Sequence, residues 1–158
     1  YQRTNFKNIF AAGDCAEIPA ASGSTVELLW YSAREQGRVA AYNMIDLPMK
    51  YDSGTYYNCA RFLDMDYMTV GKTMDLNDDE KSFEAYHPEK KMSIRIVYNK
   101  VHVIGFNMVG LRWKVDVLRK YVDHKYTLDG VLLRLKEAGF NPEFTKNYIK
   151  EIVHAKAK

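Results

Sequence analysis

The residue pair that could most readily do chemistry is Gly13-Asp14, which directly follows a short apolar run from Ile9 to Ala12. The run predicts a buried strand, because continuous apolar residues bounded by polar ones are typical of strands that are covered on both faces. In open α/β sheets, ligands bind beyond the carboxyl ends of the strands. At such an end, Gly13 would let a ligand approach the backbone. Asp14 would accept hydrogen bonds from hydroxyl groups and repel phosphate, so its expected partner is a sugar or polyol. On Gly-Asp alone, a turn or a helix cap is the commoner role.

The elements around this pair are predicted from spacing. Residues 18–25 are small and turn-forming, and we expect a flexible loop there. Residues 26–45 are predicted to form an amphipathic helix, because small or apolar residues recur every three or four positions: Trp30, Ala33, Gly37, Ala40, Ala41 and Met44. Asp46-Leu47-Pro48 ends this helix, and residues 48–55 are interpreted as a linker.

The remaining residues, 56–158, have the pattern of strands followed by helices. Residues 56–63 and 67–72 are predicted strands, and 75–81 is an acidic loop. Residues 92–98 alternate in polarity and are followed by Asn99-Lys100, which predicts a β-hairpin with a strand from Val101. Three helices are then marked by apolar spacing: Leu111 to Val122, Leu128 to Leu135 with Gly139 as its C-terminal stop, and a third opened by Asn141-Pro142. The predicted fold class is α+β.

The composition limits the function classes. Hydrophobic residues make up 47% of the 158 residues and charged residues 27%, with a net charge of +3, so the chain is predicted to be globular without an electrostatic footprint for nucleic acid. No apolar run reaches the roughly 18 residues of a membrane span. Cys15 and Cys59 form no CxxC pair, and the histidines have no metal-ligand spacing, so we expect no metal site, no disulfide and a cytoplasmic location. The chain begins with Tyr1, and we expect it to be a segment of a longer protein.

Two motifs together resemble a known family. Thr4, the apolar run, Gly13-Asp14, a small-residue loop and a helix carrying Ala-x-x-Gln-Gly-x-x-Ala-Ala occur in the order seen in FAD-dependent pyridine nucleotide-disulfide oxidoreductases. In this chain the helical motif is Ala33, Gln36, Gly37, Ala40 and Ala41. The resemblance covers residues 1 to about 45. It implies that residues 1–47 end a Rossmann-like FAD-binding domain and that 56–158 form a C-terminal interface domain, the latter by position alone.

The resemblance also implies roles for individual residues. Asp14 would accept a hydrogen bond from a ribityl hydroxyl of FAD, and Gly13 would allow the close approach. The helix is expected to begin near Glu27 and to aim its N-terminus at the pyrimidine end of the flavin, where reduced flavin is negative. The backbone N–H groups of Leu28 and Leu29 are the expected donors. Trp30 either flanks the ring or packs against the sheet.

Other family features are missing from the sequence. No Gly-x-Gly-x-x-Gly fingerprint occurs in it, and no redox cysteine motif does. Cys15 is interpreted as a small buried residue rather than a reactive thiol. His87-Pro88-Glu89 resembles the His-Pro acid/base motif of glutathione reductase-like members, but the flanking residues differ, and a turn between strands is expected. The pattern therefore favours the NADH oxidase, nitrite reductase and rubredoxin or ferredoxin reductase-like branches.

Two hypotheses of function follow. In the first, the chain is the C-terminal part of a flavoprotein that passes electrons from NAD(P)H through FAD to an unidentified acceptor, and it is inactive alone. No catalytic residue is then expected within it. In the second, it is a non-catalytic dimerisation or interaction module. Expected partners are the FAD and NAD(P)H domains of its own chain, a second copy in a homodimer and possible redox proteins, with no nucleic acid and no membrane.

Overall fold

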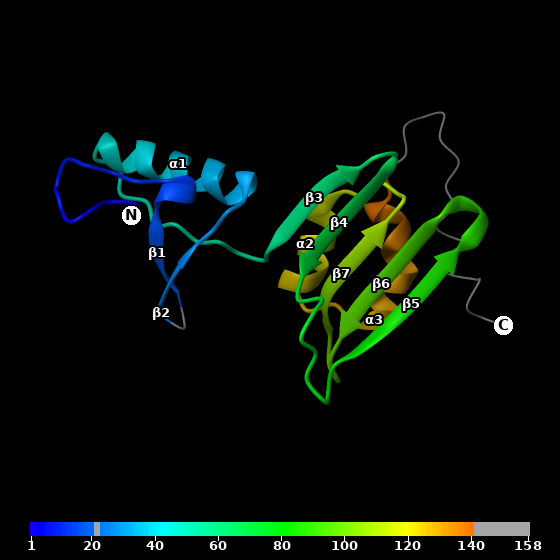
Figure 1. Cartoon of the computed structure of the whole chain (residues 1–158). Coiled ribbons are helices and arrows are strands. Elements are labelled where there is room, and N and C mark those ends of the chain that lie inside the picture. The colour runs from blue at the N-terminus through cyan, green and yellow to red at the C-terminus, as the bar shows by residue number, and fades with distance from the viewer. Residues whose placement is uncertain (21–22, 141–158) are drawn as a thin grey trace. The chain divides into compact units, whose positions relative to one another are not determined.

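The protein is described by a computed structural model covering residues 1–20 and 23–140. The chain divides into two compact units, Tyr1–Gly54 and the residues from Thr55 onward (Figure 1). The described residues form helices and antiparallel strands, so the predicted α+β class is confirmed.

The first unit contains a short 3-10 helix, a hairpin and one long helix. The 3-10 helix η1 is Gly13–Cys15, and the strands β1 (Glu17–Ala20) and β2 (Gly23–Val26) pair antiparallel. The prediction of a flexible loop over residues 18–25 was therefore wrong where the chain is described. Backbone pairing builds this hairpin, and its side chains are mostly exposed, so no apolar pattern revealed it.

Two other predictions in this unit need correction. Ile9 to Ala12 is not a buried strand: Phe10 forms only an isolated bridge with Arg3, and Ile9 is exposed. A strand is buried only when neighbouring strands and layers cover it, and the described residues of this unit supply a single bridge. The helix α1 is Trp30–Met44 and begins later than expected, because Leu29 is still extended at φ −131° and ψ 136°.

The predicted end of α1 is confirmed. Ile45 caps the helix, and Asp46 adopts a left-handed backbone with φ 58°. The N–H of Leu47 reaches back to the carbonyl of Tyr42, at 3.0 Å. This left-handed turn occupies a carbonyl at the helix C-terminus and redirects the chain.

The core of the first unit is small. Its buried hydrophobic residues, within the described part, are only Ala16, Val39 and Ala40. Two polar side chains on α1, Gln36 and Asn43, are buried beside them. A unit of this length with so few buried apolar groups gains little stability from the hydrophobic effect.

The second unit is a five-stranded antiparallel sheet with two helices on one face (Figure 1). The strands are β3 (Tyr57–Phe62), β4 (Met65–Gly71), β5 (Lys81–His87), β6 (Met92–Tyr98) and β7 (Val103–Val109), in the order β3-β4-β7-β6-β5. The helices are α2 (Val115–Asp123) and α3 (Leu128–Arg134), and the 3-10 helix η3 (Leu135–Ala138) continues α3.

The register of the strands explains the core of this unit. Met68, Met108, Ile94 and Ala85 stand opposite one another across four strands, and all are buried. Successive side chains point to opposite faces of a sheet, so residues two positions along a strand belong to the same layer. Val70, Phe106 and Ile96 form the next row of this face, and the helices cover it with buried side chains that include Leu118, Tyr121, Val131 and Leu135.

The sequence located most of these elements but not all of them. The β6–β7 hairpin is present, although its connection runs from Asn99 to His102, where the Asn99 Oδ1 atom accepts from two backbone N–H groups. The expected turn at His87-Pro88-Glu89 is confirmed, because β5 ends at His87 and a 3-10 turn (η2, Pro88–Lys90) follows. Gly139 is not a left-handed helix stop: its φ is −63° and it forms a bridge with Trp113. The third helix expected from Asn141 lies outside the described residues.

Candidate functional site

Gly13 lies where only glycine suits the backbone. It is buried at the start of η1, and its φ is +79°, a conformation that other residues adopt only with strain. A Cβ atom built on Gly13 would lie 3.3 Å from the Cβ of Ala33 on α1. The close approach of η1 to α1 therefore depends on a glycine on one side and a small side chain on the other.

A chain of hydrogen bonds fixes Gly13 from within the unit. Its N–H donates to the Oε1 atom of Gln36, at 2.8 Å, and the Gln36 side chain is fully buried. The Nε2 group of Gln36 donates to the Oε2 atom of Glu27, at 3.1 Å. The hydroxyl of Tyr51 donates to the same carboxylate oxygen. The path thus runs from a residue beyond the end of α1 back to the backbone of η1.

Tyr51 is held in this path as a neutral hydroxyl. Burial, together with its hydrogen bond to the Glu27 carboxylate, raises the pKa of Tyr51 far above its ordinary value. Both Gln36 and Tyr51 are donors toward Glu27, so the path needs an acceptor there, which an ionised carboxylate supplies.

Asp14 differs from Gly13 because its side chain is exposed. Within residues 1–20 and 23–140, the structure gives its carboxylate no hydrogen-bond partner. Asp14 lies within the 3-10 turn η1, so the alternative that it forms a turn is confirmed. Among the described residues its side chain caps neither η1 nor α1. Gly13 is thus anchored by hydrogen bonds, while the adjacent carboxylate is exposed.

The other predicted site residues lie at or before the start of α1. Glu27 is half-buried and belongs to the path just described, not to the helix. Leu28 is 70% exposed, and Leu29 occupies the N-cap position. The free backbone N–H groups of the helix therefore begin around Trp30, one turn later than the sequence predicted.

Trp30 is neither packed against a sheet nor buried. Its side chain is 66% exposed, the Arg34 guanidinium lies 5.1 Å from its ring centre, and Tyr31 meets it edge to face at 5.4 Å. The predicted apolar face of α1 is likewise uncovered at Ala41 and Met44. The face that is buried instead carries Gln36, Val39, Ala40 and Asn43.

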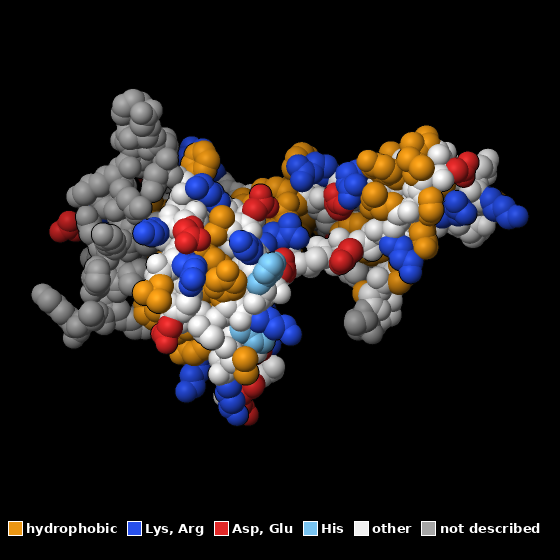
Figure 2. Space-filling model, turned by 180° about the vertical axis from the view of Figure 1, so that it is seen from behind, with side chains coloured by type: hydrophobic (Ala, Val, Ile, Leu, Met, Phe, Trp, Pro, Cys, Tyr) orange, Lys and Arg blue, Asp and Glu red, His pale blue; other side chains and the backbone are white. Residues whose placement is uncertain are grey.

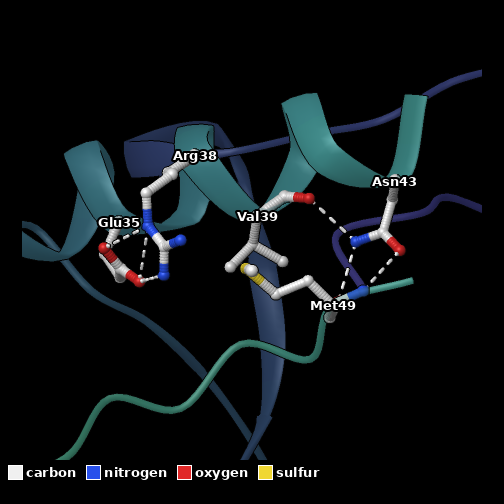
Figure 3. A network of polar contacts seen from close by, with 5 residues as sticks. All are labelled: Glu35, Arg38, Val39, Asn43 and Met49. Carbon is white, nitrogen blue, oxygen red and sulfur yellow. Dashed lines mark hydrogen bonds and ion pairs between the residues drawn. The ribbon is translucent and has the colours of Figure 1, made fainter. Parts of the chain in front are cut away.

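A second buried amide ties the end of α1 to the following segment (Figure 3). The Nδ2 group of Asn43 donates to the carbonyls of Val39 and Met49, both at 2.8 Å, and its Oδ1 accepts from the N–H of Met49, at 3.1 Å. On the exposed side of the same helix, Arg38 pairs with Glu35 (Figure 3). Residues of the predicted linker 48–55 are therefore bound to α1 through Met49, and to Glu27, ahead of the helix, through Tyr51.

The remaining candidates show no arrangement for catalysis. Cys15 was expected to be buried, but it is exposed at the last position of η1, where its Sγ donates to the carbonyl of Ala12 at 3.4 Å. Cys59 is half-buried, and the two cysteines do not form a disulfide with each other. Across residues 1–20 and 23–140, no cluster of ligating side chains could hold a metal ion, and no helix has the length and apolarity needed to span a membrane.

Sequence comparisons and structural comparisons differ in what they find. No family model and no curated protein matches the chain. Among solved structures, an NAD-dependent persulfide reductase from A. fulgidus is similar, with 21% identity, a TM-score of 0.63 and coverage of 84% of this chain and 28% of that one. A FAD-dependent pyridine nucleotide-disulphide oxidoreductase from Desulfovibrio vulgaris has 21% identity and a TM-score of 0.61, over 84% of this chain and 36% of its own.

A third similar structure is a pyridine nucleotide-disulfide family oxidoreductase from Enterococcus faecalis V583, with 17% identity and a TM-score of 0.58 over 92% of this chain and 36% of that one. At these identities the likeness is one of fold. The chain spans 28–36% of the length of the three structures. Its fold is thus that of a part of these oxidoreductases, and the resemblance found in the sequence is confirmed at this level.

Proposed function

We propose that this chain is the C-terminal part of a flavoprotein oxidoreductase that passes electrons from NAD(P)H through FAD to an acceptor still to be identified. The similar structures support this proposal through their fold, and two of them are named as NAD-dependent and FAD-dependent enzymes. The observation that carries it is the state of Gly13-Asp14: an anchored backbone beside an exposed carboxylate.

The residues present fit one portion of FAD. Asp14 has no partner among the described residues, and a carboxylate is the acceptor that a ribityl hydroxyl needs. The absence of a side chain at Gly13 leaves the backbone open to close approach. These two residues would therefore hold the sugar-alcohol chain of the cofactor.

The N-terminus of α1 would serve the pyrimidine end of the flavin. No side chain of the described residues caps this helix, so its first-turn N–H groups would be available to an anionic acceptor. The donors would be those from Leu29 and Trp30 onward, with Leu28 preceding the helix. The exposed Trp30 ring stands at the same helix end and could flank the cofactor.

The exposed surface of the first unit supports the proposal that another part of the protein packs against it. Large hydrophobic side chains are exposed along it (right in Figure 2), among them Phe6, Ile9, Leu28, Trp30, Met44 and Ile45. Exposed apolar surface of this extent marks contact with another part of a protein. In the proposed enzyme the FAD and NAD(P)H domains of the same chain, or a second copy, would cover it.

This chain would contribute binding rather than reacting groups. The flavin supplies the hydride and electron chemistry when it is bound, and we assign no catalytic residue among residues 1–20 and 23–140. The pyrophosphate and adenosine contacts would come from other parts of the enzyme. We therefore expect the 158-residue chain alone to be inactive and not to retain FAD in stoichiometric amount through gel filtration.

The test is the affinity for FAD of the longer protein that contains this chain. Asp14→Ala should weaken FAD binding about ten- to a hundredfold, because a hydrogen bond to a charged group contributes about 1.5–3 kcal/mol. Asp79→Ala, which removes the same charge from an exposed position in the second unit, is the control and should change nothing. A longer protein without visible flavin absorbance, or an Asp14→Ala variant with unchanged affinity, would contradict the proposal.

A further inference from the structure

We infer that Tyr51 and Glu27, acting through Gln36, are positioning residues that set the place of Gly13 and so present Asp14 to the cofactor. This inference rests on the proposed function for its ligand, but the arrangement itself is a property of the described chain. It gives a role to a segment that the sequence marked only as a linker.

The direction of the hydrogen bonds makes the path specific. The N–H of Gly13 is a donor, so it must meet the amide oxygen of Gln36, and the amide nitrogen must then point the other way. In that direction lies the carboxylate of Glu27, which can only accept when ionised. The chemistry of the two ends therefore admits one orientation of the buried amide.

Tyr51 closes the path at its far end. Its hydroxyl donates to the same Oε2 atom of Glu27 that Gln36 uses. Glu27 precedes α1, and the Ser32 hydroxyl of that helix donates to its backbone carbonyl, at 3.5 Å. The Gln36 amide and the Tyr51 hydroxyl donate to its carboxylate and so fix the direction of the side chain. Loss of the Tyr51 hydroxyl would free the carboxylate to turn toward solvent and would leave the Gln36 amide without its directing acceptor.

Because Gln36 is buried, loss of the Tyr51 hydroxyl would also affect Gly13. The side chain is fully buried, so water cannot replace a lost partner at little cost. A shift of the Gln36 amide therefore moves the Gly13 N–H and changes the direction in which the adjacent Asp14 side chain extends from η1.

The first measurement uses the 158-residue chain and the backbone amide signal of Gly13 in nitrogen–proton NMR spectra. Tyr51→Phe should shift that signal and speed its hydrogen exchange about three- to tenfold, the factor that corresponds to one hydrogen bond of about 1 kcal/mol. Tyr42→Phe makes the same chemical change on α1 outside the path and should leave Gly13 unchanged. The Val39 amide, in the same unit, reports general destabilisation.

A pair of buried variants adds a stronger perturbation. Gln36→Met and Asn43→Leu each replace a buried amide on the same face of α1, but only the first removes the acceptor of Gly13. The Gly13 signal should move in Gln36→Met and stay in Asn43→Leu. If both variants unfold the unit, the comparison of Tyr51→Phe with Tyr42→Phe decides alone. Equal acceleration of exchange at Gly13 and Val39 in Tyr51→Phe would overturn the inference, because it would mean a loss of stability without positioning.

The second measurement is the affinity for FAD of the longer protein. Tyr51→Phe should weaken it about three- to tenfold, with Tyr42→Phe unchanged. If Asp14→Ala weakens binding while Tyr51→Phe does not, the inference is wrong and the proposed function stands. If neither variant changes FAD affinity, the proposed function fails. The NMR signal and hydrogen exchange of the Gly13 N–H then decide by themselves whether Tyr51 and Glu27 position Gly13.

Discussion

Replacing Gly13 with alanine tests the tight contact between η1 and α1. An L-residue in the left-handed conformation costs about 1–2 kcal/mol, and the Gly13 φ of +79° lies in that region. The new Cβ would also approach the Cβ of Ala33 to 3.3 Å, which is closer than an ordinary contact. We expect Gly13→Ala to lower the free energy of unfolding of the first unit by about 2 kcal/mol. With so small a core, that loss is a large part of the unit's stability.

The same substitution at Gly37 should have the opposite sign. Gly37 lies inside α1 with no atom within 4 Å of an added Cβ. Alanine at a helix interior is favoured over glycine by about 0.5–1 kcal/mol, so Gly37→Ala should stabilise the unit. Urea unfolding, followed through NMR signals of buried Val39 in the first unit and Val70 in the second, separates the two units. An unchanged midpoint for Val39 in Gly13→Ala, or destabilisation in Gly37→Ala, would refute the geometry described for this helix.

Three further outcomes are expected. Burial, and then the Glu137 charge, raises the pKa of Tyr121 from 10.0 to about 12. Because the pKa of Tyr121 is higher in the folded state than in the unfolded state, its neutral hydroxyl contributes fully to stability below pH 10, and this contribution is lost as the pH rises toward 12. The free energy of unfolding of the second unit, measured by urea unfolding at a series of pH values, should fall over this range. Tyr121→Phe should make the fall smaller. Cys15→Ser and Cys59→Ser in the longer protein should leave NAD(P)H oxidation within a few fold, and complete loss of turnover with FAD still bound would show that a thiol takes part. Light scattering should find the chain associated, as a symmetric dimer, and a chain trimmed to begin near Lys50 less so; two strict monomers at high concentration would contradict this.

The sequence predicted the elements in which buried apolar residues and exposed polar residues follow a regular pattern. The β6 and β7 strands alternate between buried and partly exposed residues, so their pattern is strong. The sequence analysis missed β5, which is an edge strand. Of its residues Ala85 alone is buried, so no alternating apolar pattern marks the strand. The β1–β2 hairpin has no inward apolar face to detect. For Ile9 to Ala12 the apolar pattern was present, but the neighbours that would bury a strand are absent from the described residues.

The sequence singled out residues of the candidate site but not the connections between them. Gly13, Asp14 and Gln36 belong to the two motifs that carry the resemblance to the family. The pairing of Gln36 with the Gly13 backbone joins residues 23 positions apart, and that of Tyr51 with Glu27 joins residues 24 apart. No periodicity relates such partners, since they meet only after the chain has folded. The start of α1 was misplaced because Val26, Leu28 and Leu29 carry apolar side chains that suit a helix as well as an extended segment.

The bonds from Met49 and Tyr51 to the first unit bear on how the protein should be dissected. A gene cut after residue 47, where the amphipathic pattern ends, would leave α1 with the Asn43 amide open to solvent and Glu27 without its phenol partner. The compact unit continues to Gly54. Any truncation, fusion junction or protease site meant to release this unit intact therefore belongs after Gly54. Low stability of a piece that ends earlier would reflect the loss of the segment that carries Met49 and Tyr51.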